Sequence, residues 1–145
     1  MKTPIDNKLE KEIISIVESG NIDHIKNDFS SALNKYNQAW KLIPEPKLDW
    51  EIARWICSCI YNAYFDMADF SNAKNWAEIA LQTSGSNIDT SRAINMGMAC
   101  YELGQYDESY KYFSEAYNLG QTRAFKEEPK KYLDFYLNKK KIKHN

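Results

Sequence analysis

Two stretches of the sequence decide the fold. Residues 60–73 read IYNAYFDMADFSNA, and residues 96–109, which begin 36 positions later, read MGMACYELGQYDES. Aromatic, small and turn-forming residues occupy matching places in both. The match continues downstream, where Ala77 and Ala80 align with Phe113 and Ala116. Self-similarity at a period of roughly 20 to 50 residues is typical of repeat proteins, in which each unit buries its apolar face against its neighbours.

Apolar residues at helical spacing fill the segments around these two stretches. We expect helices over roughly residues 6–19, 23–42, 48–67, 70–83, 90–103 and 106–119, with a last one starting near Pro129. Gly20 is expected to end the first helix, because glycine is common just after a helix C-terminus. No segment alternates polar and apolar residues over the length of a strand. The sequence therefore predicts an all-α chain of about seven helices.

The length of 145 residues predicts one domain, spanning 1–145. Within it we expect repeats at roughly 22–46, 48–84 and 89–121, a capping segment at 122–138, a frayed basic tail at 139–145, and a loop at 84–87 between the second and third repeats. The chain is 43% hydrophobic and 14% aromatic with a net charge of -1, which excludes a disordered chain. This near-neutral charge gives no reason to expect nucleic acid or a membrane surface as a partner.

Compartment is inferred from absences in the sequence. The start turns polar at once, without the apolar core of a secretory signal, and no stretch is apolar enough to span a bilayer. The three cysteines are an odd number, and Cys57 and Cys59 would point away from each other on a helix. We therefore expect a cytoplasmic protein with reduced thiols.

The residues that usually carry catalysis are scarce. The two histidines are His24, expected to face solvent near a helix end, and His144 in the tail. Cys57 and Cys59 do not form a CxxC pair, and no zinc spacing, phosphate loop or nucleophile elbow is present. Neighbouring acids such as Glu127 and Glu128 are usually solvated. The sequence predicts no enzyme, no cofactor and no metal site.

The motif at 96–106, followed by Phe113 and Ala116, resembles the tetratricopeptide repeat, a 34-residue helix–turn–helix unit. The resemblance covers residues from about 28 to 121. It implies a right-handed helical-repeat solenoid closed by a C-terminal capping helix. An irregular helical bundle is the alternative.

Three positions depart from the repeat pattern. Tyr61 stands where the pattern has glycine, Ser109 where it has alanine, and Ala68 where it has the turn glycine.

In tetratricopeptide arrays the first helix of each pair lines a concave groove, so the resemblance implies a partner-binding set. Its members here are Trp55, Ser58, Asn62, Phe65, Asp66, Ile94, Asn95, Met98, Tyr101 and Glu102. Trp55 and Met98 are the two expected to be partly exposed, while others could pack between helices. Some arrays bind peptide C-termini through a Lys/Asn clamp. Asn62 matches the asparagine of that clamp, but Ser58 stands where the lysine belongs.

The run at 39–47, with Trp50 and Trp55, and the later segments 97–104 and 125–128 are similar to a bacterial subgroup of short tetratricopeptide proteins. Members of that subgroup often look like immunity partners of polymorphic or contact-dependent toxins. The resemblance implies a non-catalytic, cytosolic protein that binds and neutralises a cognate toxin. The alternative is a general adaptor or scaffold that binds a peptide or helix in its concave groove.

Overall fold

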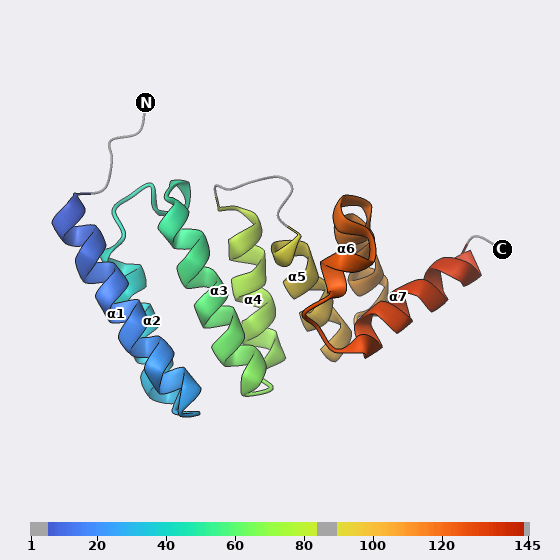
Figure 1. The fold of residues 1–145 in the computed structure, drawn as a ribbon, viewed down its shortest axis with the longest axis horizontal. Coiled ribbons are helices and arrows are strands. Elements are labelled where there is room, and N and C mark those ends of the chain that lie inside the picture. Colours follow the sequence, from blue (N-terminus) through green and yellow to red (C-terminus); the bar gives the residue numbers. More distant parts are fainter. Residues whose placement is uncertain (1–5, 84–89, 144–145) are drawn as a thin grey trace. The chain divides into compact units, whose positions relative to one another are not determined.

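The computed structural model describes residues 6–83 and 90–143, and every described regular element is helical (Figure 1). The α-helices are α1 (Asn7–Ile25), α2 (Phe29–Leu42), α3 (Glu51–Asp66), α4 (Phe70–Leu81), α5 (Ser91–Glu102), α6 (Tyr106–Gly120) and α7 (Lys130–Lys143), with short 3-10 helices η1 (Lys47–Asp49) and η2 (Gln121–Phe125). The predicted all-α class with about seven helices is confirmed. The chain divides into two compact units, Met1–Ser84 and Gly85–Asn145, here called unit 1 and unit 2.

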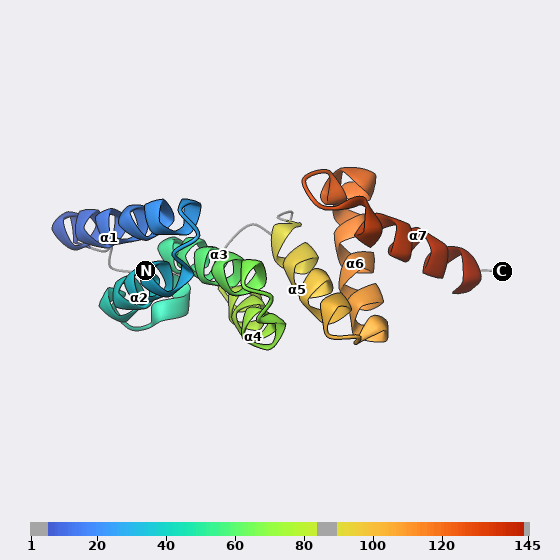
Figure 2. The same ribbon diagram turned by 90° about the horizontal axis from the view of Figure 1, so that it is seen from below.

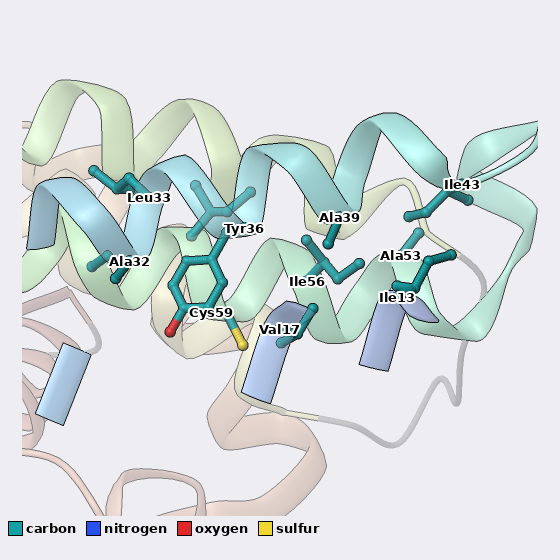
Figure 3. Packing of buried hydrophobic residues seen from close by; sticks show 12 residues of the cluster. Ile13, Val17, Ala32, Leu33, Tyr36, Ala39, Ile43, Ala53, Ile56 and Cys59 are labelled. Carbon is teal, nitrogen blue, oxygen red and sulfur yellow. The ribbon is translucent and has the colours of Figure 1, made fainter. Parts of the chain in front are cut away.

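Unit 1 consists of two antiparallel helix pairs. α1 packs against α2, α3 packs against α4, and α2 joins the pairs by packing against α3. The buried cluster between them draws on all of the first three helices (Figure 3). Its centre is the Tyr36 ring of α2, whose hydroxyl donates a 2.6 Å hydrogen bond to the Asn21 side chain of α1. The core of unit 1 is therefore made by residues from different helices, as neighbour packing in repeats requires.

Unit 2 is one helix pair closed by α7 (Figure 2). The buried Phe113 ring of α6 lies 5.2 Å from the Phe125 ring and 5.9 Å from the Tyr132 ring, measured between centroids. Tyr132 and Tyr136 of α7 are both buried. The predicted C-terminal capping helix is thus present, and aromatic side chains attach it.

The same turn connects the two helices of each pair. Its central residue has a positive φ in all three cases: 63° at Asn27, 60° at Ala68 and 76° at Gly104. The amide of the next residue then donates a 2.9 Å bond to the carbonyl five positions back, in the pattern of a Schellman cap. The three pairs α1–α2, α3–α4 and α5–α6 therefore repeat one local geometry.

Ala68 occupies this left-handed position with a Cβ, which costs about 1–2 kcal/mol for an L-residue. Replacing it with glycine is expected to stabilise the protein by about 1 kcal/mol, because glycine adopts this conformation without steric cost. Thermal unfolding followed by circular dichroism should show a rise of about 3 °C for Ala68→Gly. An unchanged or lower midpoint would contradict the assigned turn.

The prediction that Gly20 ends the first helix is wrong. α1 continues through Gly20 to Ile25, and α2 begins at Phe29 instead of near Asp23. Gly20 is present for close packing, because a Cβ there would lie 2.7 Å from a ring carbon of Tyr36. The chain reverses at Asn27 instead, where φ is positive.

The prediction that residues from 139 onward fray is wrong for the part that the structure describes. α7 extends to Lys143. Lys139 donates a 2.8 Å hydrogen bond to Asp107 of α6, and the Lys140 ammonium lies 4.4 Å from the Tyr117 ring centroid. These contacts hold the helix in register past its buried tyrosines. The predicted loop at 84–87 and the last two residues of the tail lie outside the described residues.

The register of the three pairs explains the departure at Tyr61. In two pairs a glycine on the first helix faces a large ring 16 residues later: Gly20 faces Tyr36, and Gly97 faces Phe113. In the α3–α4 pair the sizes are reversed. Tyr61 on α3 is the large residue, and Ala77, 16 residues later on α4, is the small one. Each of them is 1% exposed. One large and one small residue fill each helix interface, whichever helix supplies the large one.

The departure at Ser109 is explained by a hydrogen bond. Its buried hydroxyl donates to the Gly97 carbonyl at 2.8 Å, so the added oxygen has a partner.

Candidate functional site

The ten predicted groove residues lie on two helices in different units. Half of them are on α3 of unit 1 and half are on α5 of unit 2. Each set is therefore described within its own unit.

Trp55 is the exposed apolar residue of the α3 set. It is 37% exposed, and with Ile14 of α1 and Ile52 of α3 it lines a hollow of about 280 Å³. Glu10 of α1 and Glu51 of α3 complete the lining, and we call these five residues the α1–α3 groove. Three of its lining side chains are apolar and two are carboxylates, a combination suited to an apolar side chain with basic neighbours.

Sequence reasoning missed the α1 side of this groove. A helix end at Gly20 predicts a first repeat that begins near residue 22, which excludes Glu10 and Ile14. The usable signal was the 16-residue interval from Gly20 to Tyr36, which equals the interval from Gly97 to Phe113. In that register α1 is the first helix of its pair, as α3 is, so Glu10 and Ile14 lie on a first helix like Trp55.

The other predicted groove residues of α3 are partly exposed, and two of them also make contacts within unit 1. Asp66 accepts a 2.7 Å hydrogen bond from His24 of α1, whose ring also packs edge-on against Phe29 at 5.4 Å. His24 is therefore half-buried, contrary to the expectation that it faces solvent. Phe65 is half-buried and stacks on Tyr61 at 5.5 Å. Ser58 is half-buried and Asn62 is exposed.

Two predicted groove residues of α5 are buried. Ile94 is 2% exposed and Met98 is 3% exposed, so the expectation that Met98 is partly exposed is wrong. The reason is that α5 buries side chains around most of its circumference, including Ala93 and Met96. Met98→Glu would therefore disrupt the fold, and it is unsuitable as a test of binding.

Tyr101 and Glu102, at the end of α5, hold α7 in place. The Tyr101 ring lies 5.3 Å from the Tyr132 ring and 5.1 Å from the Phe135 ring. Glu102 accepts hydrogen bonds from the Tyr132 hydroxyl at 2.7 Å and from Lys131 at 2.8 Å. Burial acts to raise the pKa of Glu102, but these two hydrogen bonds outweigh it, and the net pKa is lowered. Asn95, the remaining predicted residue of this set, is half-buried.

The lowered pKa of Glu102 predicts an acid-sensitive attachment of α7. Its contribution to stability is complete above roughly pH 4.3, the usual pKa of glutamate, and is lost as pH falls through the lowered pKa. At pH 6, Glu102→Gln should unfold with about 1 kcal/mol less free energy than wild type. Urea unfolding at pH 6 and pH 3 should show this difference shrink in acid. A difference that stays constant between the two pH values would contradict the ion pair.

The cysteines are packing residues in the described chain. Cys57, Cys59 and Cys100 are buried and are not joined by disulfide bonds. Burial raises the pKa of Cys57 to about 12 and that of Cys59 to about 11, so both thiols stay protonated and weakly nucleophilic at neutral pH.

Neither a metal site nor a membrane-spanning helix is found among the described residues. Within 6–83 and 90–143, no cluster of three or more His, Cys, Asp or Glu side chains is placed to hold a metal ion. No helix in the same ranges combines the length and apolar character needed to cross a membrane.

Comparison with known proteins defines the class of fold. The chain is similar to the N-terminal domain of stress-induced protein-1 (STI-1) from C. elegans, with a TM-score of 0.71 and 15% sequence identity. The match covers 90% of this chain and 98% of that domain. The fold is therefore tetratricopeptide-like. No known family model and no curated protein sequence matches the chain.

Proposed function

We propose that this chain is a non-catalytic protein-binding module whose α1–α3 groove takes an apolar side chain of a partner protein. The observation that carries the proposal is that Trp55, 37% exposed, lines the groove with Ile14, Ile52 and two carboxylates. Tryptophan is the residue type most enriched among those that dominate binding energy at interfaces. The tetratricopeptide-like fold supports this proposal, because helical repeats commonly present such surfaces.

The exposed part of the Trp55 side chain contributes no burial free energy to the fold of unit 1. The other tryptophans of α2 and α4 are used in packing: Trp40 and Trp76 meet edge to face at 5.2 Å and contact the buried cluster. Trp55 is instead part of the lining of an open hollow. This contrast supports a role for Trp55 outside the fold.

Trp55→Ala is expected to weaken binding of a protein partner at least tenfold, because truncation of such an anchor costs about 2 kcal/mol or more. The free energy of unfolding should fall by about 1–2 kcal/mol, less than the cost of truncating a fully buried tryptophan, since the side chain is 37% exposed. Isothermal titration with the co-purified partner measures the affinity, and urea unfolding measures the free energy of unfolding. Leu81→Ala, at a comparably exposed apolar residue of α4, is the matched control. Equal losses of affinity in the two variants would refute the groove.

The more specific form of the proposal is a cytosolic immunity protein for a cognate polymorphic or contact-dependent toxin. Its support is the similarity of the sequence around residues 39–55 to the bacterial short-repeat subgroup. Co-expression with the product of the adjacent gene tests it by growth and co-purification. Rescue from a toxic neighbour with a one-to-one complex is the expected result. A toxic neighbour that is neither bound nor relieved would refute this form.

An adaptor that binds a peptide or helix is the second candidate, and one observation favours it. The groove is small, about 280 Å³, and three of its five lining side chains are apolar. A site of that size accommodates one or two side chains of a helix or extended peptide. Normal partner binding in a cell that lacks any toxic neighbour would support the adaptor over the immunity protein.

A further inference from the structure

A second surface, in unit 2, combines apolar and cationic side chains. Tyr101 of α5 and Phe135 and Ile142 of α7 line an open hollow of about 710 Å³. Lys139 and Lys143 belong to the same lining. Ile142 is 74% exposed and lies between Lys141 and Lys143. We call this surface the α7 hollow.

The charge of α7 is strongly positive. Its 14 residues, KKYLDFYLNKKKIK, contain six lysines and a single acid, in a chain whose net charge is -1. Lys131 also lines the α7 hollow, and Asp134 is the acid in it. Two of the lysines are paired inside the unit, Lys131 with Glu102 and Lys139 with Asp107. These ion pairs hold Lys131 and Lys139 beside the hollow and offset part of their charge.

The residues of α7 that line the hollow follow helical spacing. Lys131, Phe135, Asn138 and Ile142 line the hollow at intervals of 4, 3 and 4 residues, which places them on one face of α7. The apolar members of this face are Phe135 and Ile142, two turns apart. From Lys131 to Lys143 the helix advances by about 18 Å, or roughly three turns. We propose that the α7 hollow binds an acidic amphipathic helix of a partner protein, with its apolar residues on Phe135 and Ile142 and its acids facing the lysines.

Other polyanions fit this surface less well. Bases bind proteins by stacking on open aromatic faces. Here the Lys131 ammonium lies 5.5 Å from the Tyr101 ring centroid, so a cation already covers the Tyr101 ring. A membrane-bound helix would need its aromatic residues on the lipid side. Tyr132 and Tyr136 of α7 are instead buried in the unit.

The probe for the test is a labelled 15-residue peptide with blocked ends. Leucines are placed at intervals of 4, 3 and 4 residues and glutamates flank them. Fluorescence anisotropy with the full chain should show saturable binding that weakens as salt is raised. A peptide with lysine in place of glutamate, and one with glutamine in place of leucine, should bind at least tenfold more weakly.

Variants at the end of α7 locate the site without disturbing the fold. Lys143→Glu and Ile142→Ser should each weaken peptide binding at least fivefold. Lys141→Glu is the matched control, because Lys141 is exposed on the same turn and does not line the hollow, and it should change affinity less than twofold. Equal effects at 141 and 143 would overturn the proposal, as would absence of peptide binding. Tighter binding of a 15-nucleotide single strand or of phosphatidylserine vesicles would overturn it in favour of that polyanion.

This inference rests on the proposed protein-binding function but concerns a different surface. Trp55→Ala should leave binding of the acidic peptide unchanged. If the peptide fails to bind while Trp55→Ala still weakens a protein partner, only the α7 hollow is refuted. If the peptide binds and Trp55 has no effect on the partner, the α1–α3 groove is refuted.

Discussion

Replacing Tyr61 by glycine is expected to lower the free energy of unfolding by about 4 kcal/mol, and adding Ala77→Phe to the same chain should restore at least half of that loss. Truncating a fully buried aromatic residue typically costs 3–5 kcal/mol, and a glycine inside a helix adds up to about 1 kcal/mol. Tyr61 is 1% exposed, so none of this cost is relieved by solvent.

The rescue follows from the register of the helix pairs. With glycine at 61 and phenylalanine at 77, the α3–α4 pair would have the same arrangement as Gly97 and Phe113 in α5–α6. Ala77→Phe alone should be destabilising by about 1–3 kcal/mol, because the ring would overpack an interface that Tyr61 already fills. The free energy of unfolding lost in the double variant should therefore be smaller than the sum of the losses in the two single variants.

Urea unfolding of wild type, both single variants and the double variant measures the coupling. We expect an interaction free energy of about 2 kcal/mol or more in the direction of rescue. The control is a double variant that combines Tyr61→Gly with Ala80→Gly. Ala80→Gly removes a methyl group of α4 at a position other than 77, so this variant should show no rescue. A double variant whose loss equals the sum of the single losses would contradict the shared register.

Gly97→Ala is the second substitution with a large expected effect, a loss of about 2–3 kcal/mol. In an unconstrained helix interior this change would stabilise by roughly 0.5–1 kcal/mol. Here a Cβ would overlap the ring of Phe113, which is fully buried and has Phe125, Tyr132 and Phe135 around it. The ring cannot move aside, so the sign of the effect reverses.

Gly104→Ala provides the comparison within the same unit. A Cβ at Gly104 would meet no atom within 4 Å, but its φ of 76° is unfavourable for alanine. The loss there should be about 1 kcal/mol. Denaturant midpoints of the two variants can be compared directly. A stabilising Gly97→Ala, or a smaller loss at Gly97 than at Gly104, would show that α5 and α6 are not in the assigned contact.

The sequence predicted the second and third helix pairs well because their signals are local. The matching stretches at 60–73 and 96–109 contain both the turn and the small residues that let helices approach. The predicted end of the first helix was wrong because glycine occurs both at helix ends and at close helix contacts. Gly20 reads as a helix end by propensity, and only its contact with Tyr36 shows that it is an interface residue inside α1.

The candidate site was predictable only in part. Trp55 was identified from its helix position, but Ile14 and Glu10 of α1 could not be added until the first pair was in register. Met98 has the same sequence pattern as an exposed groove residue, and only tertiary packing makes it buried. The lysines after Asn138 looked like a solvated tail because helix propensity does not reveal their contacts with Tyr117 and Asp107.

The central claim is that the α1–α3 groove binds a protein through Trp55. Its most direct test is site-specific photocrosslinking in the native cell, with benzoylphenylalanine placed at position 55 and, as a control, at position 81. We predict one dominant crosslinked protein from position 55, absent from position 81 and retained after the complex is purified. The same set of weak crosslinks from both positions, or none from position 55 in a folded variant, would contradict the claim.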